Sequence, residues 1–417
     1  MMLGDVGDVL LATPALRQLR DASPDAHITA LTKPTTMPVL AQAGLVDAFL
    51  PVDKHLFDRP TALLRPGVVL GLLRFACDLR RRRFDAVVVL HHLVTLWGAV
   101  KFAGLALATG APMRAGLDNG RGVFLTHRAR DLGFDAAHES EYWARVVALL
   151  TPPPPAGVCN TPLPSRGEGE QVVSPLSVQG EGLGVRATSP LPVRAGRVRC
   201  APHDVGGLPT PLWGEGVLPA PTFVVSGVAQ AAADALLRTA GLAPGAPLLA
   251  VHPGSGTYSV ARRWFPERFA AVADELSCRY GLGVVLLGGA DERALADTVI
   301  GHMRRPAANL AGRTSLEELG GVLRRCALLV GNDAGVAHLA SAVGTPVVAI
   351  FGPFNHHTWR PLGRSLVVRA DPPLPCMPCV NRDFSRGYPE GCPPRYCLQE
   401  VTPAMVVAAA EQLLQTP

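Results

Sequence analysis

Short apolar runs alternate with segments of helical periodicity along most of the chain. Such a pattern is typical of buried strands and covering helices in a parallel α/β sheet. In the first third we expect strands at His27–Leu31 and Ala86–Leu90, and helices at Ala12–Ala22, Leu63–Arg83 and Glu139–Leu150. The first helix is expected to open at Thr13-Pro14, because proline is favoured at the first helical position.

The same alternation starts again at Leu248. We expect strands at Leu248–His252, Gly283–Leu287, Leu328–Val330 and Val347–Phe351. The helices expected with them are Pro266–Tyr280, Asp291–Arg304, Ser315–Arg325, Val336–Val343 and a closing amphipathic helix, Val401–Leu414. Two successive runs of this kind predict two doubly wound α/β domains that face a central cleft.

The segment 152–221 differs in composition from both halves. Of its 70 residues, 14 are proline and 11 are glycine, above the roughly 25–30% that marks low-complexity sequence. It repeats itself as TPLPSRGEG, SPLSVQGEG and TPLWGEG. Too few apolar residues remain to offset the entropy of ordering, so we expect a disordered insertion between the domains. A partner-binding linker is the alternative.

Only Met1, Met2 and Leu3 precede the first glycine loop. A Rossmann-like domain begins with a buried strand of about five residues that leads into this loop. We therefore expect a truncated first strand and a true start that lies upstream, which would leave this chain unstable or inactive.

Composition narrows the functional classes. The 417 residues suffice for two domains with their own cores. A net charge of +5 gives no reason to expect nucleic acid as a partner. The most apolar stretch, 93–111, is interrupted by Lys101 and small residues, which favours a buried segment over a membrane span. The first residues lack an export signal and the nine cysteines default to free thiols, so we expect a cytoplasmic protein.

Three glycine-containing motifs carry candidate chemistry. The first is Gly4-Asp5-Val6-Gly7-Asp8, where a carboxylate near a helix N-terminus can act as a general base on a hydroxyl. Taken alone, a Gly-Asp pair in a loop is more often turn chemistry.

The second motif is HPGSG at 252–256, followed by Arg262-Arg263-Trp264. Small residues such as Gly254 and Ser255, with paired arginines, suit a diphosphate, because guanidinium groups bind phosphate oxygens bidentately. A solvated basic turn is the alternative interpretation.

The third motif, GNDAGVAHLA at 331–340, is the most informative. It lies between a predicted strand and a predicted helix, so Asp333 and Gly335 would stand at a helix N-terminus, with His338 one turn further on. Backbone donors there can hold a phosphate or a sugar hydroxyl. A histidine alone is more often structural, but with Asp333, Gly335 and Gly344-Thr345-Pro346 in register, ligand binding is favoured.

Together GDVLLATPAL, HPGSG with RRW, and GNDAGVAHLASAVGTPVVAIFGP resemble glycosyltransferase family 9, whose best-known members are lipopolysaccharide heptosyltransferases. The resemblance covers nearly everything outside 152–221. It implies a GT-B fold with an acceptor-binding domain at 1–151 and a nucleotide-sugar-binding domain at 222–400. The last helix, within 401–417, is expected to pack back across the domains.

The resemblance also implies roles for single residues. Asp8 matches the proposed base, and Arg262 matches the basic position that contacts the donor phosphates. Asp333, Gly335 and His338 match the motif that lines the donor site. Asp291, after the Gly-Gly-Ala turn, is expected at the ribose.

Two departures leave the exact donor open. Ala334 stands where many members have Ser or Thr, and Arg262 replaces the lysine common in heptosyltransferases.

The expected reaction is an inverting transfer of a heptose or related sugar from a nucleotide diphosphate donor, ADP-heptose in the first place. The acceptor would be a cell-surface glycan or the lipopolysaccharide core. The donor half has no DxD-type motif, so we expect no divalent metal, and the sugar nucleotide is a co-substrate rather than a cofactor. A degenerate, non-catalytic sugar-nucleotide-binding protein is the alternative. An oxidoreductase is disfavoured, because no GxGxxG with a later acidic residue appears where NAD would need it.

Four cysteines gather near the C-terminus: Cys376, Cys379, Cys392 and Cys397. Four thiolates can form a structural zinc site, and the spacing permits it. Free thiols or a redox-labile pair are the alternative.

Arg80 to Arg83 end a helical apolar segment that also carries Arg65 and Arg74. Such a surface could dock on anionic lipid at the inner face of the cytoplasmic membrane, where a glycolipid acceptor would lie. A solvated helix end, where cations are favoured, is the alternative.

Overall fold

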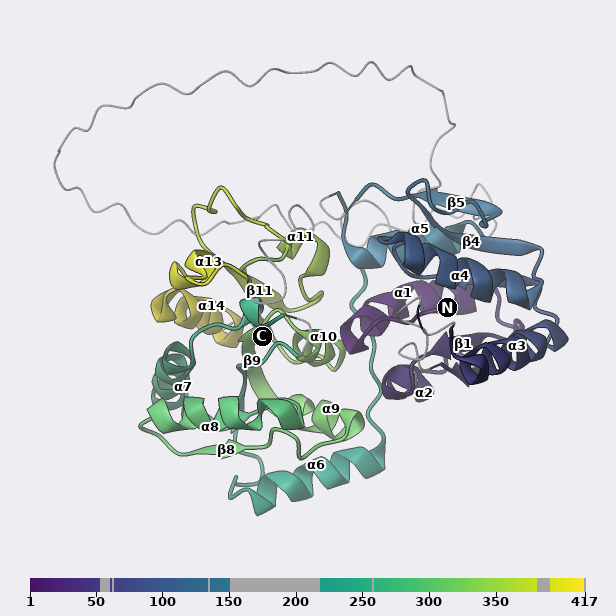
Figure 1. The fold of residues 1–417 in the computed structure, drawn as a ribbon. Coiled ribbons are helices and arrows are strands. Elements are labelled where there is room, and N and C mark those ends of the chain that lie inside the picture. Colours follow the sequence, from purple (N-terminus) through teal and green to yellow (C-terminus); the bar gives the residue numbers. More distant parts are fainter. Residues whose placement is uncertain are drawn as a thin grey trace, which may run out of the picture. The chain divides into compact units, whose positions relative to one another are not determined.

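The computed structural model describes residues 1–52, 61, 64–133, 136–150, 218–256, 259–380 and 391–415, which belong to one compact unit (Figure 1). The disorder expected for 152–221 falls almost wholly outside these residues. The helices before that segment are α1 (Val6–Ala22), α2 (Met37–Ala41), α3 (Pro66–Arg81), α4 (Leu96–Thr109) and α5 (Glu139–Ala148). The strands are β1 (Thr29–Thr32), β2 (Ala48–Pro51), β3 (Ala86–Val89), β4 (Met113–Asp118) and β5 (His127–Arg130).

The N-terminal strands are parallel and form two groups, β1-β2 and β3-β4-β5. Met1 and Met2 lie between the groups: the Met2 amide donates to the Leu31 carbonyl at 2.9 Å, and the Leu90 amide donates to the Met1 carbonyl at 3.1 Å. The first two residues therefore occupy the strand position that the pattern predicts, and the segment there is short. A cavity of about 630 Å³ lies beside it, lined by residues of β1 and β3.

Helix α1 begins at Val6, so the expected start at Thr13-Pro14 is wrong. Asp5 and Asp8 form a capping box that opens the helix about two turns earlier. Pro14 then lies inside the helix, where it cannot donate to the carbonyl four residues before it. The Thr13 hydroxyl donates to that Leu10 carbonyl at 2.7 Å instead, which replaces the missing hydrogen bond.

The second half contains a six-stranded parallel sheet in the order β11-β10-β9-β6-β7-β8. Its strands are β6 (Leu248–His252), β7 (Gly283–Leu286), β8 (Ala307–Asn309), β9 (Cys326–Asn332), β10 (Val347–Ile350) and β11 (Ser365–Val368). Read from β8, the sequence order is 3-2-1-4-5-6, the Rossmann order. The helices are α6 (Gly227–Thr239), α7 (Pro266–Tyr280), α8 (Arg293–His302), α9 (Leu316–Arg324), α10 (Gly335–Ala342), α11 (His356–Trp359), α13 (Tyr396–Gln399) and α14 (Pro403–Gln415).

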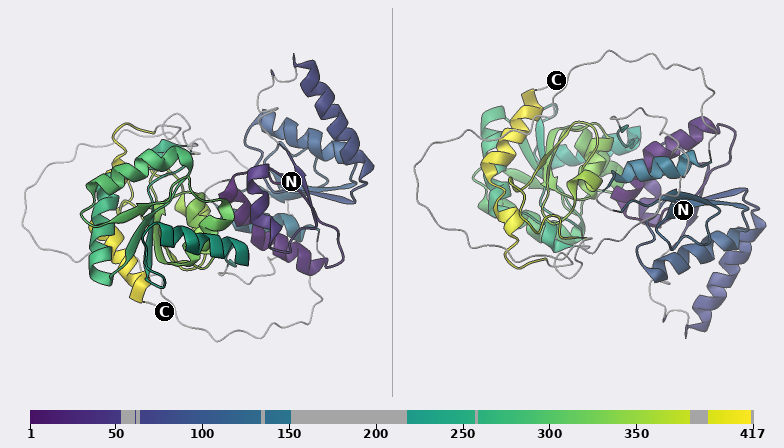
Figure 2. Two further views of the ribbon diagram at one scale, coloured as in Figure 1. Left: turned by 90° about the horizontal axis from the view of Figure 1, so that it is seen from below. Right: turned by 90° about the horizontal axis from the view of Figure 1, so that it is seen from above.

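Successive residues of the central strands join two different hydrophobic clusters. Leu248 and Ala250 of β6 pack with α9 and α10, whereas Leu249 and Val251 pack with α7, α8 and α14. Both faces of the sheet are therefore covered by helices, which Figure 2 shows from two sides. This arrangement explains why the strands read as continuous apolar runs rather than as alternating ones.

The packing of the last helix, and the contact between the two halves, can be compared with the expected two-domain arrangement. α14 packs on α7 and on β9, β10 and β11, so the elements that it contacts most closely belong to the C-terminal half. Apolar residues of α1 and α5 share one buried cluster with residues of α9, α10 and the sheet. The two halves of the described chain are thus joined by a common core.

The α6–α9 contact generates a stability prediction. A Cβ on Gly321 of α9 would lie 2.8 Å from the Ala233 Cβ of α6, whereas a Cβ on Gly301 of α8 would meet nothing within 4 Å. Gly321→Ala should therefore lower the free energy of unfolding by about 1–3 kcal/mol through overpacking. Gly301→Ala should be neutral or stabilising by up to about 1 kcal/mol, because alanine is the better helix former. Urea unfolding measures both, and an equal response of the two variants would contradict the packing argument.

Candidate functional site

The motif loops lie at the point where the strand order of the C-terminal sheet reverses. β6 and β9 are parallel neighbours at the centre of the sheet. The strand that follows β6 lies on one side of this pair, and the strand that follows β9 lies on the other. The HPGSG loop follows β6, and Asp333 and Ala334 follow β9. In open α/β sheets, ligands bind at this switch point, outside the carboxyl ends of the strands. Topology alone therefore brings the second and third motifs together.

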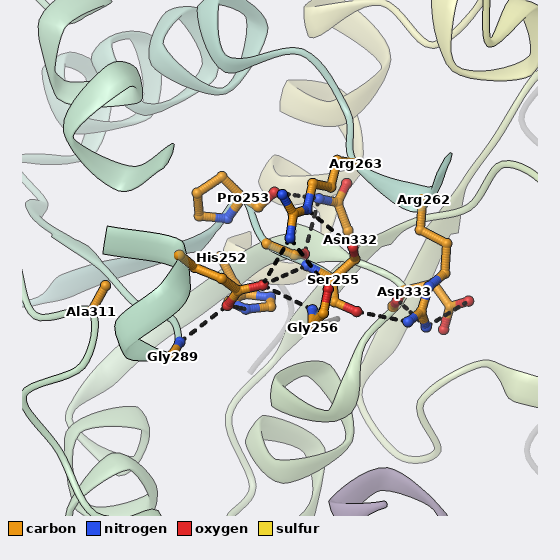
Figure 3. Close-up of polar contacts among 12 residues, drawn as sticks. His252, Pro253, Ser255, Gly256, Arg262, Arg263, Gly289, Ala311, Asn332 and Asp333 are labelled. Carbon is orange, nitrogen blue, oxygen red and sulfur yellow. Dashed lines mark hydrogen bonds and ion pairs between the residues drawn. The ribbon is translucent and has the colours of Figure 1, made fainter. Parts of the chain in front are cut away.

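A buried carboxylate organises the HPGSG loop. Glu292 Oε1 accepts hydrogen bonds from the backbone N–H groups of Ser255 and Gly256, both at 2.8 Å (Figure 3). Its Oε2 lies 3.2 Å from His252 Nε2 and accepts from the Gly289 amide at 3.1 Å. A Cβ on Gly254 would lie 2.0 Å from this carboxylate, so the loop can close around Glu292 because position 254 is glycine.

Glu292 is ionised in this setting. Burial alone would raise the pKa of Glu292, but hydrogen bonds from His252 and from backbone N–H groups lower it to about 2. Arg263 lies 3.8 Å from the same carboxylate. Its guanidinium also donates to the Ser255 hydroxyl and the Gly256 carbonyl, both at 3.2 Å, so Arg263 is tied to the loop.

Arg262 joins the two loops at the switch point. It donates to the Asp333 carbonyl at 2.9 Å and to the Ser255 carbonyl at 2.7 Å (Figure 3). Its guanidinium also lies over the Phe354 ring, at 5.0 Å from the ring centroid. The distance from Arg262 Nη1 to Asp333 Oδ2 is 3.9 Å. A cation is thus fixed where the strand ends meet.

Among the described residues, Asp333 Oδ2 and His338 Nδ1 are buried polar atoms that make no hydrogen bond. Burial raises the pKa of Asp333 to about 6, although Arg262 opposes this. Burial lowers the pKa of His338 to about 3, so its imidazole is neutral at pH 7. Buried polar atoms of this kind ordinarily have partners. These two atoms therefore point to a ligand.

Helix α10 begins with open backbone donors. Its N-cap is Ala334, and no side chain of the described residues caps the first turn. The Ala337 N–H donates to the Ala334 carbonyl at 3.0 Å, so the N–H groups of Gly335 and Val336 are the ones available to an acceptor. The helix dipole favours an anion there. Asn332, at the end of β9, connects that strand to the HPGSG loop and to Trp264. Its side-chain amide donates to the Pro253 and Gly254 carbonyls, and its side-chain oxygen accepts from the Trp264 backbone N–H.

The first motif reaches the same place. A Cβ on Gly7 would lie 3.0 Å from His338 Cδ2, and one on Gly335 would lie 3.4 Å from the Gly7 nitrogen. Asp8 follows Gly7 in the first turn of α1, and its Oδ2 accepts from the Asp5 amide at 2.7 Å. Burial raises the pKa of Asp8 to about 6; the Asp5 amide lowers it and the Glu139 charge raises it.

The structure thus gathers most of the residues that the sequence singles out: Asp8, Gly254, Ser255, Arg262, Arg263, Asp333, Gly335 and His338. Asp291 is exposed, and its neighbour Glu292 makes the buried contacts. Sequence reasoning missed Glu292 and Asn332. The acidic pair Asp291-Glu292, which follows Gly288-Gly289, indicates a carboxylate at this turn. The sequence does not show which of the two side chains is buried.

The C-terminal cysteines do not form a metal cluster among the described residues. Cys376 and Cys392 are exposed, whereas Cys397 is buried in the core beside Gly352. Burial raises the pKa of the Cys397 thiol to about 12. The structural zinc site and the free thiols both stay predictions.

The Glu292 contacts predict a pH-dependent loss of stability. An amide in Glu292→Gln cannot accept all of the N–H groups, so the free energy of unfolding at pH 7 should fall by about 1–3 kcal/mol. Because the folded-state pKa of Glu292 is lowered to about 2, the carboxylate stabilises the fold above its ordinary pKa. That advantage over glutamine should shrink as the pH falls towards 2. Asp291→Asn is the matched control and should have little effect, since Asp291 is exposed. Unfolding measured from pH 2 to 7 would contradict the prediction if both variants behaved alike.

The comparisons with known proteins agree with the site. Residues 219–387 match the model for glycosyltransferase family 9 (heptosyltransferase). Lipopolysaccharide heptosyltransferase 3 of Escherichia coli is 33% identical over 155 residues, which are 36% of this chain and 43% of that relative. Lipopolysaccharide heptosyltransferase 1 of Pseudomonas aeruginosa is 30% identical over 190 residues, 42% of this chain and 50% of that relative. The chain thus spans half or less of the length of these curated relatives.

Solved structures show the same fold. A family 9 glycosyl transferase from Veillonella parvula superposes with a TM-score of 0.68 at 22% identity, covering 100% of this chain and 96% of that one. The E. coli ADP-heptose heptosyltransferase II gives 0.64 at 20% identity, with 98% and 96% covered. These neighbours confirm the predicted GT-B architecture with parallel sheets. Residues 219–387 therefore match the model of glycosyltransferase family 9, and the chain resembles the lipopolysaccharide heptosyltransferases of that family.

Proposed function

We propose that this protein is an inverting glycosyltransferase that moves a heptose or a related sugar from ADP-heptose to the lipopolysaccharide core or a similar cell-surface glycan. The observation that carries the proposal is the pair of unpartnered atoms, Asp333 Oδ2 and His338 Nδ1, beside Arg262 at the uncapped start of α10. A sugar diphosphate offers both kinds of group that this site lacks: hydroxyls for the orphan atoms and an anion for the cation and the helix dipole.

The names of the relatives support the donor. Several similar proteins are lipopolysaccharide heptosyltransferases, and one solved neighbour is an ADP-heptose heptosyltransferase. Another, E. coli heptosyltransferase WaaC, was solved with ADP; it superposes with a TM-score of 0.60 at 17% identity over 99% of this chain and 98% of that one. An ADP-linked sugar is therefore the donor to test first.

The proposed reaction is a single displacement. The acceptor oxygen attacks the anomeric carbon, the bond from that carbon to the diphosphate oxygen breaks, and the hydroxyl proton passes to the Asp8 carboxylate. Arg262 and the first N–H groups of α10 stabilise the charge that develops on the leaving diphosphate. This chain's own cations and backbone donors supply that stabilisation, so we expect transfer without a divalent metal or cofactor; activity that survives a chelator checks this.

Donor binding and transfer should separate in variants. Arg262→Ala removes a charged donor at the diphosphate, so the calorimetric affinity for ADP should fall about 10–100-fold. Asp333→Ala should also weaken ADP binding. Arg279→Ala is the matched control. Arg279 is half-exposed and pairs with Glu275 of α7 and Glu411 of α14, so its loss should not change the affinity for ADP. Asp8→Asn should keep ADP binding but lower the transfer rate about 10²–10⁴-fold.

Each other outcome has a meaning. Tighter binding of UDP or GDP than of ADP would keep the reaction class and discard heptose. Binding of ADP without transfer by the folded wild type would favour the degenerate, non-catalytic protein. Full transfer activity in Asp8→Asn would remove Asp8 from the role of base.

We also propose that the protein works on the cytoplasmic face of the membrane, where it meets a glycolipid acceptor. None of the described helices is long and apolar enough to cross a membrane. α3 has one buried residue, Leu79, although its apolar positions repeat at helical spacing. Leu70 and Leu73 of α3 are 50% and 58% exposed, and Leu96 of the neighbouring α4 is 73% exposed. Figure 2 shows α3 beside α4 at the edge of the N-terminal half.

Charge complementarity favours an anionic lipid surface as the partner of this α3–α4 face. The exposed arginines Arg65, Arg74 and Arg81 lie on α3 or at its start. Exposed leucines flanked by arginines are typical of helices that lie in the headgroup region of anionic bilayers.

Vesicle flotation tests this surface. The wild type should float with vesicles that contain anionic lipid and should bind zwitterionic vesicles several-fold less. Leu70→Glu with Leu73→Glu should abolish flotation, because it removes apolar contact and adds repulsion. Val228→Glu is the matched control, since Val228 is 83% exposed on α6 and outside the α3–α4 face. A wild type that does not float but forms dimers lost in Leu70→Glu would assign the face to a second copy of the chain.

A further inference from the structure

A buried group of three ionisable side chains lies next to the first motif and has no role in the reaction proposed above. His92 follows β3, Asp131 follows β5, and Glu139 is the first residue of α5. Asp131 Oδ2 lies 2.9 Å from His92 Nδ1, and Glu139 Oε2 lies 3.0 Å from His92 Nε2. All three side chains are at most 6% exposed. One imidazole is therefore held by two carboxylates, one on each ring nitrogen.

The arrangement requires a charged histidine. With a carboxylate at both nitrogens, the imidazole can satisfy both only when both nitrogens donate, as in imidazolium. Burial would lower the pKa of His92, but the hydrogen bonds to Asp131 and Glu139 raise it to about 9. Burial raises the pKa of Glu139, and the hydrogen bond and the charge of His92 oppose that rise. With the three groups ionised, the set carries one net negative charge. The rings of Tyr142 and Trp143 pack against the imidazole, with centroid distances of 5.0 and 5.3 Å.

The set is anchored against α1, which carries Asp8. The Ser140 hydroxyl, next to Glu139, donates to the Leu11 carbonyl of α1 at 2.8 Å. Among the described residues, the groups around Asp8 are Asp5 from its own helix cap, Lys33 after β1, Glu139 from α5, and His338 from α10. Lys33 is paired with Asp5, and His338 is neutral. The Glu139 carboxylate is thus the negative charge that α5 presents to Asp8.

We propose that His92 is a positioning residue for transfer: together with Asp131 it holds the Glu139 carboxylate, ionised, beside Asp8, and this fixed negative charge makes Asp8 a stronger base. The inference rests on the proposed role of Asp8 as base. His92 does not touch substrate in this scheme. It acts by keeping a second carboxylate charged in a buried place, where an unpaired carboxylate would take up a proton.

The pH dependence of kcat/KM for sugar transfer tests the proposal. In the wild type the rate should fall on the acidic side as Asp8 takes up a proton. Glu139→Gln removes the neighbouring charge, so this acidic limb should move down by about 0.5–1 pH unit. His92→Gln removes the cation that keeps Glu139 ionised, so the limb should move in the same direction. The second variant also covers the case in which Glu139→Gln does not fold.

Glu141→Gln is the matched control. Glu141 lies two residues further along α5 and pairs with Arg145 on the same helix. The same chemical change there should leave the limb in place. A group that is merely structural would lower the unfolding midpoint of Glu139→Gln and His92→Gln without moving the limb.

The failures are distinguishable. A limb that stays in place in folded Glu139→Gln and His92→Gln, while Asp8→Asn is inactive, overturns this inference and leaves the proposed function intact. A limb that moves equally in Glu141→Gln also overturns it, because the shift would then report the net charge of the helix. Full activity of Asp8→Asn would overturn both this inference and the base assignment.

Discussion

The start of α1 meets the start of α10 at two glycines, and the candidate site depends on this contact. A Cβ on Gly7 would press on the His338 ring at 3.0 Å, and one on Gly335 would touch the Gly7 nitrogen at 3.4 Å. Both helices direct their positive N-terminal ends towards the same region, which is unfavourable unless an anion lies between them. Asp8 and Asp333 supply negative charge there, and an anionic ligand would supply more. Close packing of the two helices thus creates a need for the ligand that the residues fit.

The buried carboxylate of Glu292 gives the two neighbouring arginines, Arg262 and Arg263, different contacts. Glu292 accepts the N–H groups of the HPGSG loop and lies close to Arg263, which is also bound to that loop. Arg262 instead spans from the Ser255 carbonyl to the Asp333 carbonyl and so holds the two loops at a fixed separation. One arginine therefore shapes the loop, while the other presents positive charge at the switch point. Sequence alone treats the pair as equivalent, because their difference arises from a partner 29 or more residues away.

Much of this architecture follows from local pattern. The central strands of the C-terminal sheet, such as β6 and β10, are buried on both faces, so apolar runs mark them within a residue or two. The motif loops follow those strands, and the Rossmann order then places them together. The edge strands β8 and β11 are only half-buried, and the apolar pattern did not predict them. What the pattern missed has two causes, local capping at α1 and long-range contacts elsewhere. Helix α1 begins at Val6 because Asp5 and Asp8 cap it, and Thr13 repairs the gap left by Pro14. The choice of Glu292 over Asp291 and the meeting of His92 with Asp131 and Glu139 depend on the folded chain.

Three of the four buried histidines near the site among the described residues differ in charge, and the difference follows from their partners. His92 lies between two carboxylates and is a cation. His138 has the Arg360 carbonyl at 3.0 Å from Nε2, and burial lowers its pKa to about 4. His338 has no partner at Nδ1 and is neutral. In the proposed reaction, the neutral His338 near Arg262 would leave the diphosphate to the arginine and could offer the sugar an acceptor or a donor. The His92 cation would instead hold negative charge next to the proposed base, Asp8. The positions of the carboxylates thus decide which histidine is charged: His92, between two carboxylates, is a cation, whereas His138 and His338 are neutral.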